Sequence, residues 1–535
     1  VDKEEKNTLT VGANSSKEFI INLSNPNNRV ARYNFYYVGS IPDNVEIGYI
    51  VDCETNSLPE AKGINLEKVD TIGSSNIYKI IVNNESANEV TITLGVNVGL
   101  DYNDLSLPEN GHLFSEYTNN EPNAPELDDN MIAVTYNGSN WVKADNSNVD
   151  NVWYNYDSGE WANAVTVSSS SRSSYLSAEA GTVINMDDIE TMWVWIPRYS
   201  YSIGSVDGVN YYGKQGEFLD TVPTQELPGE IDVKFVRSGE KDSCSAQYTV
   251  GEEITTWYTP DAFTFGDEEL NGIWVGKFET SSSDPSASNG GDNTTDSDAM
   301  IKPNVTSWRN INVSNAFNVS LKMNDNGNRY GFTDAVDTHM MKNSEWAVVS
   351  YLSQSKYGKL GNESFTGANK EIYQNKSNQY ITGCSYGAPS NNNIDYGCHY
   401  TYDIDINGTG ASTTGNIYGI YDMSGGAWEY VMGNYNDIIG NSGFSSMPEA
   451  KYYDKYTSSD VNTACNGTSC ISHGLKETAG WYNDYKNMLT ENASWFVRSG
   501  GSNNSNISGL FNFHDTSLSG NNDPYDTFRL TTVIK

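Results

Sequence analysis

The sequence predicts a mainly β protein with few helices, and two observations carry this expectation. Asn, Ser, Gly and Tyr are used heavily, which favours strands joined by long polar loops. Runs of β-branched and aromatic residues recur along the chain, and turn-forming residues separate them. A chain of 535 residues is long enough for two or three domains, which we place at residues 1–104, 105–190 and 191–535.

The first 104 residues predict a β-sandwich. Four segments are β-branched or aromatic and partly alternating, and Asn-rich turns punctuate them. They are residues 18–23, 31–38, 77–82 and 90–98. This spacing suits an immunoglobulin-like sandwich. The pattern resembles the small β-sandwich that often lies nearest the anchor in Gram-positive-type surface proteins.

Residues 105–190 predict a linker followed by a small β-hairpin module. The linker, residues 105–130, is acidic and rich in Pro and Asn. Two similar turns follow at residues 136–142 (YNGSNWV) and 154–162 (YNYDSGEWA). Each turn lies between aromatic strand ends, as expected for hairpins.

The remaining residues, 191–535, predict an α+β domain. Dense aromatic strands are expected at residues 192–199 (MWVWIPRY) and 273–280 (IWVGKFET). The sequence predicts helices near residues 313–322 and 344–352. In the second helix Trp346, Val349 and Leu352 fall on one face.

The composition excludes some partners. The chain has 32 basic and 69 acidic residues, a net charge of −37, which would repel the phosphates of a nucleic acid. This charge suits solubility and divalent-cation binding, and a solvated acidic surface explains it equally. No apolar run approaches the roughly 20 residues of a membrane span. Because residue 1 is Val rather than Met, we expect that a signal or anchor segment was removed or lies outside this chain.

The six cysteines predict local disulfides and export. The two close pairs are Cys384 with Cys398, and Cys465 with Cys470. Such pairs in polar loops are typical of an oxidising compartment, so we expect an extracellular location on a cell or particle surface. Metal binding through thiolates is disfavoured because no C-x-x-C occurs. Cys53 and Cys244 either pair or stay free.

Residues 419–430 (GIYDMSGGAWEY) form the most informative stretch of the chain. Its three glycines permit tight backbone turns. Trp428 and Tyr430 can anchor such a turn against a core, which would hold the oxygen donors Asp422 and Glu429 in place. The stretch resembles the G-L-Y-D-M-x-G-N-x-W-E-W signature of the formylglycine-generating-enzyme (sulfatase-modifying-factor) family, a branch of the C-type-lectin-like fold.

Other motifs resemble the same family in the same order. They are residues 273–280 (IWVGKFET, similar to F-x-I-x-K-Y-E-V-T), 302–310 (KPNVTSWRN, similar to P-V-x-x-V-S-W-x-D-A), 341–349 (MKNSEWAVV, similar to L-P-T-E-A-E-W-E-Y-A-A), and 496–502 with 528–530 (FVRSGGS and FRL, similar to R-G-G-S-W and G-F-R). The resemblance implies a C-type-lectin-like domain of the formylglycine-generating type over about residues 273–533.

The resemblance also locates the family's catalytic positions. The family's oxidases use two cysteines shortly after the R-G-G-S motif, which bind copper and activate oxygen. Ser505 and Leu510 occupy those positions here, and neither can supply a thiolate. The related sulfoxide-synthase branch uses a histidine set for iron, whereas the histidines here are scattered without facial-triad spacing: His339, His399, His473 and His514. We therefore expect a non-catalytic member.

A calcium site is a further implication of the resemblance. Its ligands would be the side chains of Asp422 and Glu429 and the backbone carbonyls of Gly425 and Ala427. Hard cations take six to eight oxygens and mix carboxylates with carbonyls. Gly426 departs from the family, which usually has Asn there. The alternative is that Asp422 and Glu429 only cap the turn.

The segment from residue 503 to residue 526 is the candidate ligand-binding face. On a C-type-lectin-like fold this region lies on the exposed face that holds the active site in enzymes. Asn, Ser and Tyr supply adaptable hydrogen bonds and rigid contact area. The candidate ligand-binding residues are Asn503, Asn504, Asn506, His514, Asp515 and Tyr525. The alternative is a plain loop packed on its own core.

Three functions compete on these observations. The leading hypothesis is a secreted or surface-displayed, non-enzymatic binding or adhesion protein whose ligand is a glycan or a protein surface. The alternative is a structural subunit of an extracellular fibre or phage appendage that self-assembles through its β-sandwich, because edge strands permit augmentation. A formylglycine-generating-type oxidase is the third, and the missing cysteines disfavour it.

Overall fold

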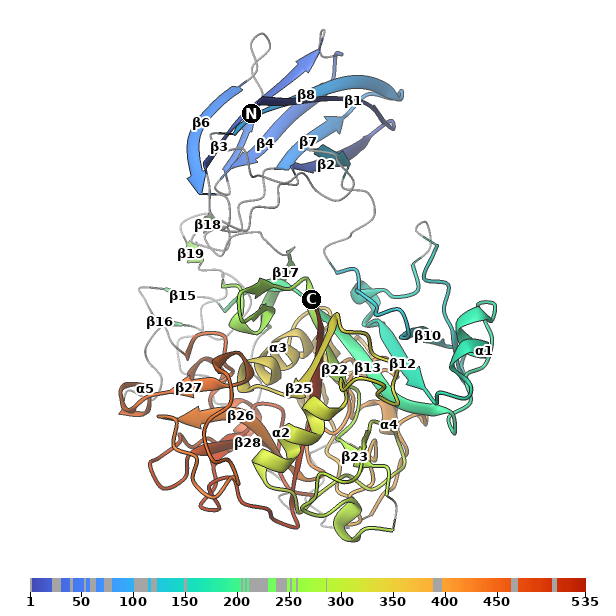
Figure 1. The fold of residues 1–535 in the computed structure, drawn as a ribbon, viewed down its shortest axis with the longest axis vertical. Helices are drawn as coiled ribbons and strands as arrows, with labels where there is room; N and C mark the ends of the chain where they lie inside the picture. Colours follow the sequence, from blue (N-terminus) through green and yellow to red (C-terminus); the bar gives the residue numbers. More distant parts are fainter. Residues whose placement is uncertain are drawn as a thin grey trace. The chain divides into compact units, whose positions relative to one another are not determined.

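The computed structural model places most of the chain in two compact units (Figure 1). The residues it describes are 2–21, 30–38, 42–51, 54–57, 64–71, 79–100, 114–116, 123–148, 152–203, 205–206, 209–210, 230–236, 248–250, 253–255, 258–284, 286–387, 397–462, 470–502 and 508–535. Strands account for 30% and helices for 16%, which confirms a mainly β protein with few helices. The first unit comprises Val1–Glu121 and Arg237–Ala246, and the second comprises Pro122–Val236 and Gln247–Lys535.

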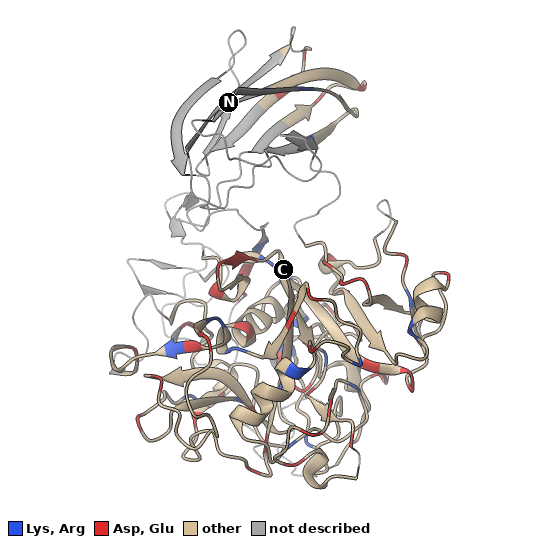
Figure 2. Ribbon diagram, viewed as in Figure 1, with Lys and Arg blue, Asp and Glu red and all other residues tan. Residues whose placement is uncertain are grey.

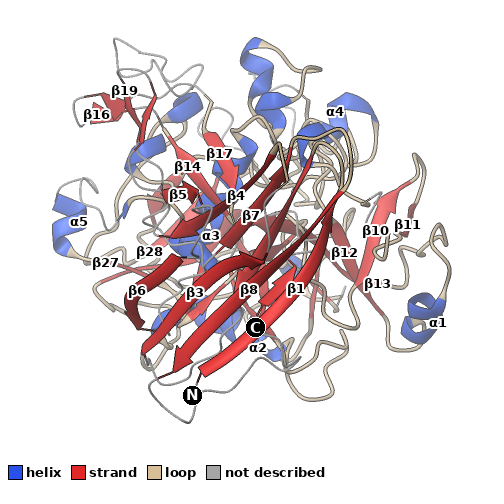
Figure 3. Ribbon diagram, turned by 90° about the horizontal axis from the view of Figure 1, so that it is seen from above, coloured by secondary structure: helices blue, strands red, loops and turns tan. Residues whose placement is uncertain are grey.

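The first unit is built from two β-sheets (Figure 3). One sheet has the order β1 (Asp2–Val11), β8 (Val90–Leu100), β3 (Val30–Val38) and β6 (Ile64–Thr71). The other has the order β5 (Glu54–Ser57), β4 (Val45–Val51), β7 (Lys79–Asn84), β2 (Ser15–Ile21) and β9 (Phe114–Glu116). Each strand pairs antiparallel with its neighbours, and β1 pairs with β8 without a break from Asp2 to Val11.

Alternating apolar residues explain why these two sheets pack together. The buried side chains are Leu9, Val11, Ile92 and Leu94 from the first sheet, and Val45, Ile47 and Val82 from the second. On β1 the exposed Thr8 and Thr10 alternate with the buried Leu9 and Val11, as expected for a strand with one face in a core.

The second unit is organised around a seven-stranded sheet. Its order is β11 (Trp141–Lys143), β10 (Ile132–Tyr136), β12 (Asn163–Val167), β13 (Ile189–Pro197), β22 (Gly272–Gly276), β31 (Leu530–Ile534) and β25 (Val336–Met340). The aromatic strands β13 and β22 are buried along their whole length and pair antiparallel, with Trp195 opposite Trp274. Continuous apolar sequence is what a strand covered on both faces requires.

The hairpin strands of residues 105–190 belong to this same sheet. Strand β12 pairs with β13 from Asn163–Val194 to Val167–Ile189, and β10 and β11 continue the sheet outward from β12. The domain boundary expected at residue 190 therefore falls inside the sheet rather than between two modules. The reason is that the consecutive strands β12 and β13, which are joined through residues 168–188, pair across the expected boundary, and sequence composition does not show which strands pair.

A second sheet in this unit contains the ends of two of the sequence motifs, residues 419–430 and 496–502. Its order is β27 (Asp454–Tyr456), β26 (Trp428–Tyr435), β28 (Trp495–Ser499) and β29 (Phe513–Asp515), and β30 (Asp526–Phe528) pairs with β26. Five two-stranded ladders complete the unit: β14 (Tyr199–Ser202) with β17 (Asp232–Phe235), β15 (Ser205–Val206) with β16 (Val209–Asn210), β18 (Tyr248–Val250) with β19 (Glu253–Thr255), β20 (Thr264–Phe265) with β21 (Glu268–Glu269), and β23 (Ser281–Ser282) with β24 (Ala299–Met300).

The described helices are short and lie in the second unit. They are α1 (Arg172–Ser177), α2 (Val313–Lys322), α3 (Asn343–Ser353), α4 (Asp405–Thr409) and α5 (Ser458–Asn462). Helices α2 and α3 confirm the two helices that the sequence predicts. Every residue of α3 is buried, so this helix is enclosed on all sides and does not present only the face of Trp346 to the core. None of the helices in the described residues is long and apolar enough to span a membrane.

The disulfide expected between Cys384 and Cys398 is present. The Cα atoms of the two residues lie 5.3 Å apart, within the range that a disulfide requires. Cys470 is also disulfide-bonded, while its expected partner Cys465 lies outside the described residues, so that pairing stays a prediction. The residues at positions 53 and 244 lie outside them as well.

Candidate functional site

The turn before β26 is shaped by glycines. Gly425 and Gly426 have φ values of +79° and +73°, in the left-handed region that side chains disfavour. A Cβ on Gly426 would lie 2.2 Å from Glu279 Oε1, and one on Gly425 would lie 2.2 Å from the carbonyl oxygen of Asn375. Asp422 has a φ of +63° as well. The turn therefore brings its backbone against Glu279, a residue of another motif.

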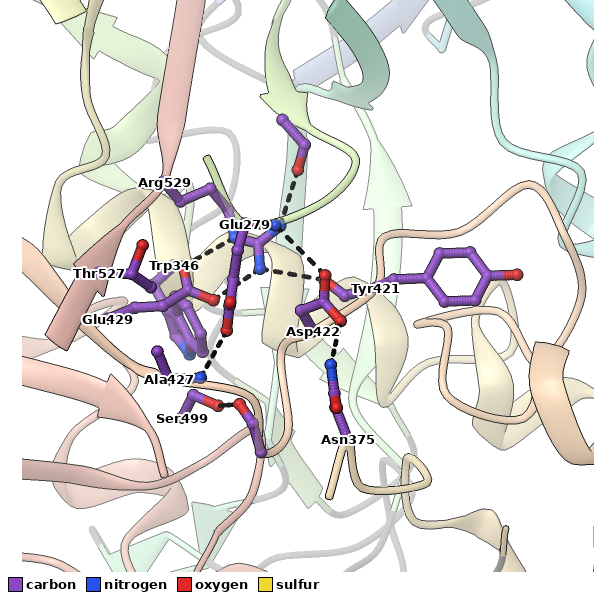
Figure 4. Close-up of polar contacts among 12 residues, drawn as sticks. Glu279, Trp346, Asn375, Tyr421, Asp422, Ala427, Glu429, Ser499, Thr527 and Arg529 are labelled. Carbon is purple, nitrogen blue, oxygen red and sulfur yellow. Dashed lines mark hydrogen bonds and ion pairs between the residues drawn. The ribbon is translucent and has the colours of Figure 1, made fainter. Parts of the chain in front are cut away.

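A buried cluster of charged residues lies at this turn (Figure 4). It consists of Glu279, Asp422, Glu429 and Arg529, with exposed fractions of 0%, 2%, 0% and 0%. Arg529 holds Glu429 through two hydrogen bonds, Nη2 to Oε1 at 2.6 Å and Nε to Oε2 at 2.9 Å. Its remaining donors reach the carbonyls of Gly276 and Tyr421. Three motifs that are far apart in sequence thus meet in one place.

Asp422 and Glu279 are held mainly by backbone and amide donors. Asp422 Oδ1 accepts from Asn375 Nδ2 at 2.9 Å and from the Gly383 amide at 2.8 Å, and Oδ2 accepts from the Glu279 amide at 3.3 Å. Glu279 Oε1 accepts from the Ala427 amide at 2.9 Å. Glu279 Oε2 is buried without a hydrogen-bond partner. The cluster therefore contains one unsatisfied carboxylate oxygen, which is costly in a protein interior.

Burial dominates the electrostatics of the cluster. It raises the pKa of Glu279 well above its usual value, and repulsion from Asp422 and Glu429 raises it further. Burial also raises the pKa of Asp422, and it raises the pKa of Glu429 to about 7 despite the opposing effect of Arg529. Three carboxylates and one guanidinium would carry two net negative charges if all were ionised. The cluster must therefore keep protons or hold a cation.

The oxygen atoms of this turn suit a hard cation chemically, but two hydrogen-bond donors compete for them. Carboxylates and carbonyls in a glycine-rich turn are oxygen ligands of the kind calcium takes, and Glu279 Oε2 lacks a partner. Arg529, however, engages both oxygens of Glu429, and Ser499 Oγ donates to the Gly425 carbonyl at 2.8 Å. Among the described residues, no group of three or more His, Cys, Asp or Glu side chains is arranged to hold a metal ion. Calcium binding by Asp422, Gly425, Ala427 and Glu429 stays a prediction.

Chelation is expected to lower the melting temperature of the second unit if calcium binds this turn. A ligand bound only by the folded state stabilises that state, and its removal reverses the gain. Asp422→Ala should lower the melting temperature as well and abolish the response to chelator, while Asp157→Ala, at an exposed position, should preserve that response. Calorimetric melting with and without EGTA measures this, and identical curves would contradict the site.

The structure places three of the six candidate ligand-binding residues at the surface. His514 and Asp515 end β29 and are half-buried, and Tyr525 immediately precedes β30 with 56% of its surface exposed. The other three, Asn503, Asn504 and Asn506, lie outside the described residues. The Trp428 amide donates to the Tyr525 carbonyl at 2.9 Å, so the start of β30 lies beside β26, while β29 pairs with β28.

Two aromatic residues belong to the same face and were not singled out as ligand contacts from sequence. The rings of Trp428 and His514 meet edge to face with centroids 4.5 Å apart, and those of Tyr485 and His514 meet edge to face at 5.6 Å. Tyr485 is 44% exposed. Trp428 is part of the 419–430 motif, and the sequence predicts that its ring anchors the turn against the core rather than contacting a ligand. Tyr485 lies in an irregular segment with no periodic signal.

The positions of the family's catalytic cysteines are occupied differently. Leu510 is 5% exposed, and its carbonyl accepts a hydrogen bond from Trp346 Nε1 at 2.8 Å, so it is part of the core beside α3. Ser505 lies outside the described residues. His339 is buried: its Nε2 atom lies 2.9 Å from Glu345 Oε1, and its ring stacks on the ring of Phe265. Leu510 and His339 therefore have structural contacts of their own.

Comparison with known proteins does not classify the chain. No protein-family model matches it, and no curated protein matches it significantly.

Proposed function

We propose that this protein is a surface-displayed, non-enzymatic binding protein whose second unit is a C-type-lectin-like domain of the formylglycine-generating type. The convergence of Glu279, Asp422, Glu429 and Arg529 supports this assignment, because these residues come from three separate motifs of the resemblance. The first unit, with two antiparallel sheets around one apolar core, is proposed to be the immunoglobulin-like stalk.

The observation that carries the binding function is the exposed aromatic and polar face at the end of β29. His514 and Asp515 lie there with Tyr485, and Tyr525 precedes β30. Backbone pairing of β29 with β28 and of β30 with β26 holds these strands in place. Rigid aromatic side chains next to adaptable polar ones form efficient contact surfaces.

Absence of oxidase activity and an extracellular location are part of the same proposal. A serine and a leucine at positions 505 and 510 remove the thiolates that copper chemistry needs. The disulfide between Cys384 and Cys398 favours an oxidising compartment. Copper-dependent turnover of a cysteine-containing peptide by the purified protein would contradict the non-enzymatic assignment.

One observation favours the second candidate, a fibre subunit. Strand β1 is ten residues long, lies at the end of its sheet and pairs regularly with β8, so its other edge offers backbone groups to another strand. Lys3 and Lys6 on this strand oppose such augmentation, because charged edge residues discourage pairing. We therefore retain fibre assembly as the alternative.

Alanine replacement of the six candidate ligand-binding residues is expected to abolish attachment of the protein to its target surface. The residues are Asn503, Asn504, Asn506, His514, Asp515 and Tyr525. Changes at exposed positions such as Tyr525 usually cost under about 0.5 kcal/mol, whereas His514 and Asp515 are half-buried in β29 and make a folding check necessary. The assay applies labelled protein to intact cells and to arrays of cell-surface proteins and glycans, with circular dichroism as a folding check.

A variant with the exposed carboxylates Asp157 and Glu449 changed to alanine serves as the matched control and should attach normally. Undiminished attachment by the six-residue variant would reject the binding face. If electron microscopy then showed polymers, the fibre-subunit alternative would take its place.

A further inference from the structure

We propose that Arg309, Tyr380 and Tyr525 form a binding site for a carboxylate group of a partner protein. This inference rests on the proposed binding function and names the chemistry of the group that is recognised. Three observations support it: a buried arginine that no carboxylate neutralises, unpartnered polar atoms beside it, and two tyrosines next to its guanidinium.

The guanidinium of Arg309 is held in place but has no counter-ion. It is 8% exposed, its Cζ atom lies 3.8 Å from the centroid of the Tyr380 ring, and Nη1 donates to the Pro524 carbonyl. Among the described residues no carboxylate forms an ion pair with it, although acidic residues occur along many loops of the second unit (Figure 2). Asp523, which is near in sequence, accepts from the Tyr525 amide at 2.9 Å. A buried charge without a partner is costly, so a bound anion would gain an interaction that the free protein lacks.

Unpartnered polar atoms gather on the same side of two paired segments. Ser281 and Ser307 face each other in an antiparallel bridge. Because side chains alternate along extended backbone, Arg309 falls on the side of Ser307. Glu279 falls on the side of Ser281 for the same reason. The buried atoms without a hydrogen-bond partner on this side are Glu279 Oε2, Ser281 Oγ, Ser307 Oγ and Arg309 Nε. Buried polar atoms are nearly always paired, so this concentration indicates a site that a bound group completes.

The backbone around the guanidinium is strained. Tyr380 has a φ of +55° and Asn310 has a φ of +61°, in the left-handed region that is unfavourable for a bulky side chain such as tyrosine. The Tyr380 side chain forms a hydrogen bond with Ser502, which fixes the ring over Arg309. Strained backbone of this kind is concentrated at sites that bind ligands.

The site is bordered by surface groups. Burial lowers the pKa of Arg309, and Tyr525 is among the groups that oppose this change, so the Tyr525 hydroxyl lies close enough to act on the guanidinium. Tyr525 is 56% exposed, and Pro524 beside it is exposed as well. A partner therefore reaches the guanidinium from the surface at these two residues.

The chemistry of the site favours a carboxylate on a protein. With Nη1 bonded to the Pro524 carbonyl, the edge of Arg309 that carries Nε and Nη2 remains, and this planar edge matches the two oxygens of a carboxylate. Arginine and tyrosine are also the residues most enriched at the energetic centres of protein interfaces. The group recognised is therefore the side chain of an Asp or Glu, or a chain terminus.

Fluorescence anisotropy with two labelled peptides tests the inference on the whole chain. One peptide carries glutamates and a free carboxyl terminus, and the other carries glutamines and an amidated terminus. The acidic peptide should bind at least about tenfold more tightly, because only it supplies carboxylates. Arg309→Lys keeps the charge, loses the planar edge and should weaken binding of the acidic peptide about tenfold.

Arg329→Lys is the matched control, because Arg329 is already paired with Glu190 at 2.7 Å and with Asp298 at 3.3 Å. This variant should bind the acidic peptide as the parent protein does. Tyr525→Ala, at an exposed position, should weaken binding several-fold without affecting the fold. Equal affinity of the parent protein for the two peptides would overturn the inference, whatever the stability of the variants.

Amidation of the carboxyl groups on target cells separates this inference from the proposed function. Loss of attachment after amidation supports a carboxylate as the recognised group. Attachment that survives amidation but is lost in the six-residue alanine variant would overturn the carboxylate site and leave the binding function standing. Binding to an oligosaccharide that carries glucuronate, without binding to the acidic peptide, would overturn the assignment to a protein. Absence of attachment to any cell, protein or glycan would overturn both proposals.

Discussion

Replacing Arg529 by methionine is expected to destabilise the second unit by about 3–5 kcal/mol, the usual cost of removing one partner from a buried ion pair. The substitution leaves the Glu429 carboxylate without its two charge-assisted hydrogen bonds. The carbonyls of Gly276 and Tyr421 also lose their donors. Glu279 and Asp422 then remain buried without the guanidinium of Arg529 beside them. Urea unfolding, monitored by tryptophan fluorescence, measures the loss.

Glu429→Gln is the informative companion to this change. It removes one of three buried negative charges and keeps an amide oxygen for Arg529, so its cost should be much smaller than that of Arg529→Met. In the double variant with Met at both positions, the uncompensated charge at 429 disappears, and part of the lost stability should return. Arg529→Met with an unchanged midpoint and slope of unfolding would show that the pair does not stabilise the fold.

The chelator experiment and the Arg529 series address the same cluster from two sides. If calcium contributes, chelation and Asp422→Ala act together, and Arg529 only balances the remaining charge. If chelation has no effect, the raised pKa values of Glu279 and Glu429 imply that protons neutralise what Arg529 does not. In either case the ion pair between Glu429 and Arg529 is retained, because both carboxylate oxygens of Glu429 accept from Arg529.

Sequence predicted the elements whose signals are local. The aromatic strands β13 and β22 and the helices α2 and α3 were expected from composition and periodicity, and the disulfide of Cys384 with Cys398 from spacing. The sequence did not predict that β10, β11 and β12 belong to the central sheet. The pairing of β12 with β13 follows a long connection and depends on which strand edge is free.

The candidate site was predictable in part for the same reason. Asp422 and Glu429 stand in one short motif, but Glu279 becomes their neighbour only because Gly426 lacks a side chain and lets the turn approach it. Arg529 belongs to the 528–530 motif, but the sequence assigns it no role, because its partner Glu429 lies 100 residues away. Tyr485 reaches His514 from an irregular segment whose sequence carries no periodic signal.

Asp484 is expected to make the stability of the second unit fall as pH rises. Its side chain is 3% exposed, and burial raises its pKa from 3.8 to about 8, while the Phe511 amide at 2.9 Å from Oδ2 opposes the rise only in part. Between these two values the unfolded chain is ionised at this residue and the folded chain keeps its proton. The folded state therefore binds more protons, and the free energy of unfolding decreases with pH across that window. The total decrease is on the order of a few kcal/mol, because it scales with the difference between the folded and unfolded pKa values of Asp484. Below the window both states are protonated and the slope vanishes.

Asp484→Asn should remove this slope. The amide oxygen of Asn can still accept from the Phe511 amide, and the substitution removes the ionisable group at this position. Gly509 leaves room for the side chain, since a Cβ on Gly509 would lie 2.0 Å from Asp484 Oδ1. The variant should be more stable than the parent protein near pH 8 and lose that advantage near pH 4. Glu371→Gln should reduce the slope as well, because burial raises the pKa of Glu371 and each carboxylate repels the other. Urea unfolding at a series of pH values measures the difference, and parallel curves for the parent and Asp484→Asn would show that Asp484 is ionised throughout in the folded protein.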